Sequence, residues 1–498
     1  MLLRRLFRSL APGSRGGDAG RALALVEAGD LDGAEAAALG ALREDPDAPL
    51  AHLALGRIAL ARGAPERARG FLERALAAAP ELDAARAPLA AIAVRSGRHD
   101  EAIGHYRAAL ERNARSPELL HALGAALIET GEFDEAASAL AQALALAPGL
   151  TAARENLSRA LFNARRFTEA AAVERELLRH DPDAIRLHLR LAHALLSEGR
   201  LDEGWTQYEW RLQQPGFTWG VRGLPRWDGG APAGRTVLVV SEQGLGDAIL
   251  FARFVPELAR RGARVRLLCR PPLERLFRSS FAAESIQVTT DATGDVADVD
   301  AYIHLLSLPH ALGLGAAAVE PRTRYLTVEP ALADDWRRRV AAESGLKVGL
   351  AWAGNAARSG DEARSLAPEV VAPLGRAAGG IRWFSLQANL DASAPRPFAM
   401  TDWMASVTDF ADTAALIGAL DLVVSVDTSV AHAAAAAGTP LWLLAPHNVC
   451  WRWEMAGTGS PWYPGVRSFR APRPQAWTPV IEAVGAALRR AASAGTPA

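Results

Sequence analysis

The first 200 residues contain a repeat with a period of 34 residues, which restricts this part of the chain to a stacked architecture. Each unit predicts two amphipathic helices, because a glycine allows the left-handed turn between them and a proline ends the second. One helix pair cannot bury its apolar face alone, so the units must stack. The glycine positions are Gly29, Gly63, Gly97, Gly131 and Gly199, with Arg165 in the remaining slot. Small residues follow five positions later at Ala34, Ala68, Ala102, Ala136, Ala170 and Gly204, and prolines recur at Pro46, Pro80, Pro148 and Pro182, with Ala114 in the missing slot.

This period and punctuation resemble the tetratricopeptide repeat. The resemblance implies an α-solenoid over residues 19–214, with about five full units and a closing helix near 201–212. Arrays of this kind present a groove to a protein segment, so we expect a protein partner or acceptor there. The closing helix carries Trp205, Tyr208 and Trp210, an aromatic face suited either to docking on the next domain or to a simple cap. Histidines on the repeat helices are expected on solvated faces, namely His52, His105, His121 and His188.

Composition excludes several classes of function. The net charge of −1 gives no electrostatic reason to expect nucleic acid. The single lysine, Lys347, stands in a Leu-Lys-Val context, which excludes a P-loop and disfavours a Schiff-base enzyme. The two cysteines, Cys269 and Cys450, form no metal or disulfide framework. Residues 1–18 read as a basic tail without the apolar core of a signal peptide, and no segment fits a membrane span, so we expect a cytoplasmic protein.

After a linker rich in glycine, proline and tryptophan at 215–233, strands and helices alternate. This alternation predicts parallel sheets with helices on both faces, in two Rossmann-like halves at 234–335 and 345–498. Expected strands include 236–241, 264–269, 285–290 and 301–306 in the first half, and 347–353, 382–387, 422–426 and 441–445 in the second. Ligands of such sheets bind at the carboxyl ends of the strands, so two facing halves would place both ends at one cleft.

Four stretches fall at these strand ends. The first is Ser241–Ala248, in which Gly244 and Gly246 allow a sharp turn before Asp247 at a helix start. The second comprises Gly354, Asn355, Arg364 and Ser365. The third places Asp427 at the end of a buried strand, with Thr428, Ser429 and His432 at the start of a helix whose dipole favours a phosphate. The fourth runs from His447 to Trp453 and continues at 460–464. Asp427 and Asp247 could instead be ordinary helix caps, and His432 a packed core histidine.

Together, these motifs resemble the heptosyltransferase type of GT-B glycosyltransferase (glycosyltransferase family 9), fused to tetratricopeptide repeats. The resemblance covers residues 227–470 and rests on Glu242–Asp247, Ser307–Pro309, Trp352–Asn355, Arg364–Ser365, Leu420–His432 and Ser460–Pro464. The overall architecture is similar to that of the protein O-GlcNAc transferases.

The resemblance implies inverting transfer of a sugar from a nucleotide sugar to an acceptor hydroxyl, without a cofactor or metal. Asp247 would be the general base, and the loop of Gln243, Gly244 and Gly246 would face the acceptor. On the donor side, Asp427 would contact the sugar or ribose, Thr428 and Ser429 would hold the diphosphate, and Arg364 would stabilise the leaving phosphate. Gly354, Asn355, Ser365 and His432 complete the expected donor side. The pair Asp298 and Asp300 spells a metal-binding motif of another glycosyltransferase fold, but we expect a loop there.

Two alternatives remain open from the sequence. One is a non-catalytic interaction scaffold with a degenerate GT-B domain. It is favoured by departures from the family pattern: Arg358 in place of a histidine, Ala356 in place of a proline, and Cys450 in place of an aspartate. The other is a transferase for a lipopolysaccharide or capsule sugar. The repeat array favours a protein acceptor.

Overall fold

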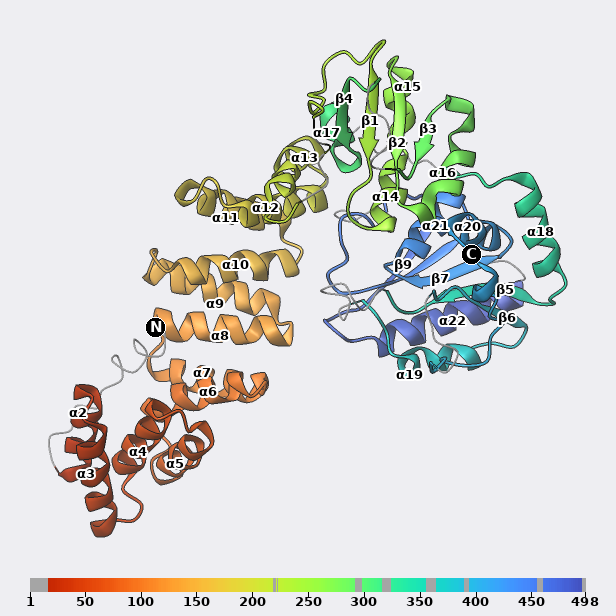
Figure 1. The fold of residues 1–498 in the computed structure, drawn as a ribbon. Helices are drawn as coiled ribbons and strands as arrows, with labels where there is room; N and C mark the ends of the chain where they lie inside the picture. The colour runs from red at the N-terminus through yellow and green to blue at the C-terminus, as the bar shows by residue number, and fades with distance from the viewer. Residues whose placement is uncertain are drawn as a thin grey trace. The chain divides into compact units, whose positions relative to one another are not determined.

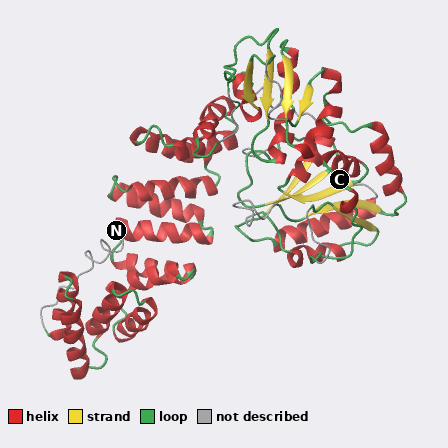
Figure 2. Cartoon of the chain, in the orientation of Figure 1, coloured by secondary structure: helices red, strands yellow, loops and turns green. Residues whose placement is uncertain are grey.

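The structure is a computed structural model, and it describes residues 17–217, 221, 223–291, 298–315, 324–354, 364–388, 394–454 and 460–494. The chain divides into two compact units, one ending at Asp181 and the other beginning at Pro182. Among the described residues, the first unit contains helices and no strand, and the strands lie in the second unit (Figure 2). The fold is therefore an N-terminal α-solenoid followed by an α/β region with parallel sheets. The domain boundaries that we place at 19, 215, 234, 335 and 345 stay predictions.

The first unit is a succession of antiparallel helix pairs (Figure 1). Its small residues do what the repeat predicts: Ala34, Ala68, Ala102 and Ala136 are fully buried at the contact between paired helices. The pairs are α2 (Asp18–Ala28) with α3 (Leu31–Glu44), α4 (Pro49–Ala61) with α5 (Pro65–Ala78), α6 (Arg86–Arg95, preceded by the short helix η1, Asp83–Ala85) with α7 (His99–Arg112), α8 (Pro117–Thr130) with α9 (Phe133–Leu146), and α10 (Thr151–Asn163) with α11 (Phe167–His180).

Left-handed residues make the turns within the pairs. Gly29, Gly63, Gly97 and Gly131 have φ between 71° and 87°, and Arg165 adopts the same region with φ 62°. The backbone of the turn is therefore preserved even where the glycine is lost.

Three of the four repeat histidines are buried, so the expectation that they lie on solvated faces is wrong for these three. His52, His121 and His188 are at most 9% exposed. His52 and His188 each contact the carbonyl of the repeat proline six residues earlier, at 3.0 and 2.7 Å, and Arg86 and Arg154 donate to Pro80 and Pro148 in the same way. This position therefore anchors the turn before four of the first helices, and the exception is Leu120, six residues after Ala114. Only His105 of the four is partly exposed, as expected.

The second unit begins with a further helix pair, α12 (Ile185–Glu198) and α13 (Leu201–Tyr208), and the short helix η2 (Glu209–Gln213). Trp205 and Tyr208 are buried in this unit, so the docking interpretation of the closing helix holds for these two residues. Trp210 differs, because its ring stacks on His188 of α12 with 3.7 Å between centroids.

Within the described residues, the first sheet has the order β3-β2-β1-β4, and every pairing is parallel. Its strands are β1 (Thr236–Val240), β2 (Arg264–Leu268), β3 (Gln287–Thr289) and β4 (Ala301–His304). Its helices are α14 (Leu245–Ala252), α15 (Val255–Arg260), α16 (Glu274–Ser280) and α17 (Leu308–Ala311), with η3 (Pro271–Leu273), η4 (Ala282–Glu284) and η5 (Leu305–Ser307). Contrary to the expectation from the sequence, Asp247 does not begin its helix: the helix starts at Leu245 and is interrupted at Arg253 and Phe254, before Pro256.

The second sheet has the order β6-β5-β7-β8-β9, again parallel throughout in the part that the structure describes. Its strands are β5 (Leu346–Ala351), β6 (Ile381–Ser385), β7 (Leu422–Val426), β8 (Leu441–Ala445) and β9 (Val466–Arg470), of which the last was not expected. The accompanying helices are α18 (Pro330–Ala341), α19 (Pro368–Val371), η8 (Ala372–Arg376), η9 (Met404–Ser406), α20 (Phe410–Gly418), α21 (Ser429–Ala437) and α22 (Thr478–Ala494).

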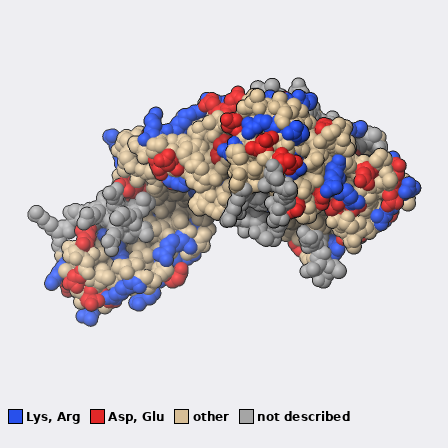
Figure 3. Space-filling view, turned by 45° about the horizontal axis from the view of Figure 1, so that its top comes forward, with Lys and Arg blue, Asp and Glu red and all other residues tan. Residues whose placement is uncertain are grey.

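One hydrophobic cluster contains residues of both sheets and of α13, with Val237 and Val239 from β1, Val423 from β7 and Trp205 among its members. A separate cluster lies between the second sheet and α22. The two sheets and the last helix pair therefore share one continuous core within the second unit. On the face shown in Figure 3, acidic and basic side chains are interspersed, in keeping with the net charge of −1. Among the described helices, none has the length and apolar character needed to cross a bilayer.

Candidate functional site

In both sheets, the order in which successive strands are added changes direction next to the candidate residues. In the first sheet, β2 lies on one side of β1 and β4 on the other, so the loops after β1 and β4 flank a switch point. In the second sheet, β6 and β7 flank β5 in the same way, with Ala351 paired to Ser425 at the strand ends. Such switch points are where open parallel sheets bind ligands. The candidate residues of both halves follow these strands.

Helices α14 and α21, which follow β1 and β7, pack against each other (Figure 1). Gly246 makes this approach possible: a Cβ at this position would lie 2.7 Å from Cδ2 of His432 and 3.4 Å from Cα of Ser429. Gly246 and the start of α21, which the sequence predicts on the acceptor and donor sides, are thus brought together, and Gly246 serves close helix packing.

Asp247 lies at the third position of α14 and is 7% exposed. Its Oδ2 accepts a hydrogen bond from the Gly244 amide at 3.1 Å, which caps the helix. Its Oδ1 is 2.7 Å from Nε of Arg452. Burial alone lowers the pKa of Arg452, but Asp247, Tyr208 and Cys450 together outweigh it, and the pKa stands well above its ordinary value. Asp247 is therefore both a cap and one half of a buried ion pair.

Asp427 follows β7, and its Oδ1 accepts a hydrogen bond from the indole of Trp453 at 2.7 Å. Thr428 is the N-cap of α21, yet its hydroxyl contacts the Ser425 hydroxyl at 3.2 Å and makes no side-chain cap bond. Ser429 is the first helical residue, and both are partly exposed. The amides of the first turn of α21 thus lack the side-chain acceptor that usually satisfies them, which suits them to an anion.

His432 is buried one turn into α21. Its Nδ1 is 3.0 Å from the Tyr463 hydroxyl, its ring lies 4.3 Å from that of Trp453, and its Nε2 is 3.9 Å from Oδ1 of Asp427. Desolvation by burial lowers the pKa of His432 to about 4. The ring is therefore neutral at pH 7 and acts as a packed, hydrogen-bonded partner beside Asp427.

The loop after β5 is held in place from within the second sheet. Gly354 donates its amide to the Ser365 hydroxyl at 2.8 Å, so these two predicted residues are brought together. Gln387, which the sequence did not single out, accepts from the amides of Trp352 and Ala353 at 3.1 and 3.0 Å. Arg364 is partly exposed on the same segment. Asn355, with Ala356 and Arg358, lies outside the described residues.

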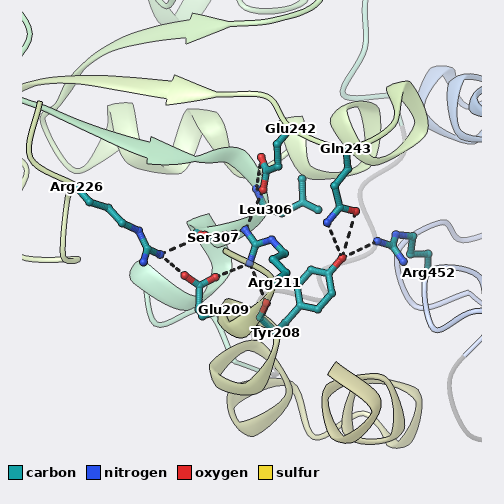
Figure 4. Close-up of polar contacts among 9 residues, drawn as sticks. All are labelled: Tyr208, Glu209, Arg211, Arg226, Glu242, Gln243, Leu306, Ser307 and Arg452. Carbon is teal, nitrogen blue, oxygen red and sulfur yellow. Dashed lines mark hydrogen bonds and ion pairs between the residues drawn. The ribbon is translucent and has the colours of Figure 1, made fainter. Parts of the chain in front are cut away.

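The acceptor-side loop contacts the last repeat helix, as Figure 4 shows. Gln243 has φ 64°, a conformation that few non-glycine residues adopt, and its amide contacts the Tyr208 hydroxyl at 3.1 to 3.3 Å. Arg452 donates to the same hydroxyl at 3.2 Å. Sequence reasoning included the stretch His447–Trp453 but assigned no role to Arg452. An arginine between two tryptophans was the available signal.

A second network anchors this loop (Figure 4). Arg211 of η2 donates to Glu242 at 2.9 Å and to Ser307 at 2.8 Å, and Glu242 accepts from the Leu306 amide at 3.3 Å. Burial raises the pKa of Glu242, and Arg211 offsets only part of this effect. Glu209 pairs with Arg211 and with Arg226. The loops after β1 and β4 are thus joined through a buried arginine of the last repeat.

Asp298 and Asp300 have structural roles in the first sheet. Asp300 accepts from the Thr236 amide at 2.6 Å, and Asp298 forms an ion pair with Arg266 at 2.6 Å. Across the described ranges, no group of three or more His, Cys, Asp or Glu residues could hold a metal ion. Both cysteines are free.

Comparison with known proteins supports the repeat array. Profiles of the tetratricopeptide repeat match residues 20–83, 93–149 and 155–209. A curated relative, Protein FlbA of Caulobacter vibrioides, is 29% identical over 341 residues, which are 62% of this chain; the chain spans 55% of that protein's length.

Among solved structures, YrrB, described as a TPR protein with an unusual peptide-binding site, is 18% identical, with a TM-score of 0.34 over 35% of this chain and 91% of its own. The MamA protein is 20% identical, with a TM-score of 0.32 over 34% of this chain and 92% of its own. The profile matches alone show that the chain carries tetratricopeptide repeats within residues 20–209.

Proposed function

We propose that the α/β region is a glycosyltransferase of GT-B type, which moves a sugar from a nucleotide sugar to an acceptor hydroxyl. The observation that carries this proposal is the junction of α14 and α21. It places an aspartate from the switch point of one parallel sheet beside an uncapped helix start from the switch point of the other. A base and an anion site side by side are what such a transfer needs.

In this proposal, the acceptor hydroxyl oxygen attacks the anomeric carbon of the donor sugar while the bond from that carbon to the diphosphate oxygen breaks. Asp247 takes the hydroxyl proton. A carboxylate oxygen has more than one lone pair, so the contacts with Gly244 and Arg452 do not by themselves prevent Asp247 from accepting this proton. The amides at the start of α21, with Thr428 and Ser429, hold the negative charge of the leaving nucleoside diphosphate, and Arg364 adds to this charge stabilisation. Asp427 contacts the donor sugar or ribose.

We infer that the acceptor is a hydroxyl on a protein that the repeat array selects. Tetratricopeptide repeats support a protein partner, and the last repeat pair contacts the loop that holds Asp247. A lipopolysaccharide or capsule sugar as the acceptor is the alternative. Intact-mass analysis of candidate proteins, alongside assays with purified glycolipid acceptors, separates the two by showing which one gains the mass of a sugar.

A binding screen is the first test. The full chain is heated with ADP-, UDP-, GDP- and CMP-sugars at millimolar concentration, and one nucleotide class should raise the melting temperature, since a ligand that binds only the folded state stabilises it. Thr428→Tyr and Ser429→Tyr should abolish that shift by filling the space before the helix start. If none of the four classes shifts the wild type, the enzyme proposal fails.

The second test concerns the base. Asp247→Asn should keep the ligand-induced shift and lose transfer by a factor on the order of 100 to 10,000. Retention of full transfer removes Asp247 from this role.

A non-catalytic scaffold is the second candidate, and one observation favours it: both oxygens of Asp247 already have partners. This candidate predicts that sugar nucleotides leave the melting temperature unchanged and that no candidate protein gains the mass of a sugar, although a partner protein still binds the array.

A further inference from the structure

The hydroxyl of Tyr208 in α13 lies between two groups of the α/β region (Figure 4). Arg452 Nη2 is 3.2 Å from it, and the side-chain amide of Gln243 is 3.1 to 3.3 Å from it. Tyr208 is 4% exposed, so water does not compete freely for these contacts. The last repeat helix therefore places one polar atom at the side of the site where Asp247 lies.

The donors and acceptors settle the direction of these bonds. Arginine can only donate, so the Tyr208 oxygen accepts from Arg452. The Tyr208 proton then needs an acceptor, and Gln243 Oε1 at 3.3 Å is the one within reach. The same bond joins α13 to the side chain of Gln243, whose backbone is left-handed at the start of the glycine loop. One hydroxyl thus fixes both the arginine and the loop.

The guanidinium of Arg452 is oriented by three different partners. Nη2 goes to Tyr208, Nη1 is 3.6 Å from the sulfur of Cys450, and Nε faces Asp247 at 2.7 Å. Its plane also lies over the ring of Trp451 at 4.5 Å. Among these contacts, the Tyr208 hydroxyl comes from the repeat array and the others come from the α/β region.

We propose that Tyr208 is a positioning residue, which orients Arg452 against Asp247. Through this residue, the last repeat helix contributes to the reaction site. The inference rests on the proposed function, in which Asp247 is the base. Without the hydroxyl, the guanidinium loses its anchor on the repeat side, and the aspartate loses a fixed counter-charge. The consequence falls on the chemical step and not on donor binding, which takes place at α21.

The test uses the nucleotide sugar that gives the largest shift in the binding screen. Tyr208→Phe keeps the ring and removes the hydroxyl, and it should lower kcat by about tenfold, with the donor KM unchanged within about twofold. Tyr106→Phe is the matched control, since Tyr106 is a tyrosine with 4% exposure in the first unit. That control should leave kcat unchanged.

A double-mutant cycle separates positioning from mere packing. If Tyr208 acts through Arg452, then Tyr208→Phe should cost nothing further in an Arg452→Lys background. Losses that multiply in the double variant, or a kcat equal to that of the wild type, overturn the proposal.

A crystal structure of Tyr208→Phe gives a readout that needs no transfer activity. Displacement of Arg452 from Asp247 supports the positioning role, whereas an unchanged ion pair overturns it. Absence of transfer in the wild type, with Arg452 displaced in the variant, counts against the proposed function alone.

Discussion

Gly246 of α14 lies against His432 of α21 so closely that a Cβ on the glycine would be 2.7 Å from the imidazole. The histidine has little freedom to yield, because Tyr463 is hydrogen-bonded to it and Trp453 packs on its ring. The packing of α14 against α21 therefore leaves no room for a side chain larger than hydrogen at position 246.

Gly246→Ala should destabilise the second unit by about 1–3 kcal/mol, since overpacking displaces buried side chains. Urea unfolding followed by tryptophan fluorescence measures the change. Gly418→Ala is the control in the same unit, because no atom outside its own helix lies within 4 Å of a Cβ there. It should be neutral or stabilising by up to about 1 kcal/mol. Equal stability of the Gly246 variant and the wild type contradicts the packing role.

Arg165→Gly should stabilise the repeat array. Arg165 has φ 62°, which costs a side-chain-bearing residue roughly 1–2 kcal/mol. Its guanidinium lies 5.4 Å from the ring of Phe167. Losing this cation–π contact lowers the unfolding free energy by about 0.5 kcal/mol. The expected net gain is on the order of 0.5–1.5 kcal/mol, visible as a higher melting temperature in calorimetry. Gly131→Ala, at the equivalent turn, should have the opposite sign.

Arg211→Met should destabilise the second unit by about 3–5 kcal/mol, because it leaves the buried carboxylate of Glu242 without its partner. The double variant Arg211→Met/Glu242→Gln removes both charges and should recover part of that loss. Chemical unfolding of the three proteins gives the comparison. If the double variant is less stable than Arg211→Met, the ion pair is not the main contribution of Arg211.

Acid should weaken the second unit through His432. Its pKa is about 4 in the folded protein and near 6.5 when unfolded, so the unfolded chain binds more protons between these values. The contribution of His432 to the unfolding free energy is fully present above pH 6.5. It decreases by about 3 kcal/mol as the pH drops toward 4. Asp427, Asp247, Arg452 and Arg253 all contribute to the field at the ring.

The unfolding free energy at several pH values between 7 and 4 tests this expectation. In His432→Gln, the decrease over that range should be smaller by about the same amount. A pH dependence identical to that of the wild type means that His432 titrates normally in the folded state.

Local chemistry explains what the sequence could predict. The period of 34 and its glycines determine the helix pairs. Arg165 keeps the left-handed turn conformation although it replaces the glycine that favours it. Buried apolar runs predicted most of the strands. Edge strand β9 was missed because Val466–Arg470 alternates polar residues without a strong apolar run.

What the sequence could not give are contacts between distant segments. Tyr208 and Arg452 are 244 positions apart, and no local pattern links them. The buried histidines were misjudged for a related reason: the proline carbonyl that His52 contacts lies in the preceding turn, and burial depends on the neighbouring helices. Asp247, Asp427 and His432 could be singled out as candidates because they follow strands, which is a local signal.

The sixth helix pair, α12 and α13, belongs to the same compact unit as the two sheets, whereas the five pairs before it form the other unit. Duplication or loss of repeats before Asp181 would change the reach of the array and leave the core around Trp205 intact. The same event at α12 or α13 would remove Arg211 and Tyr208 from the loops that they hold. The Asp181–Pro182 boundary is therefore the place to exchange repeats by engineering, because a change there leaves Arg211 and Tyr208 on the loops that they hold.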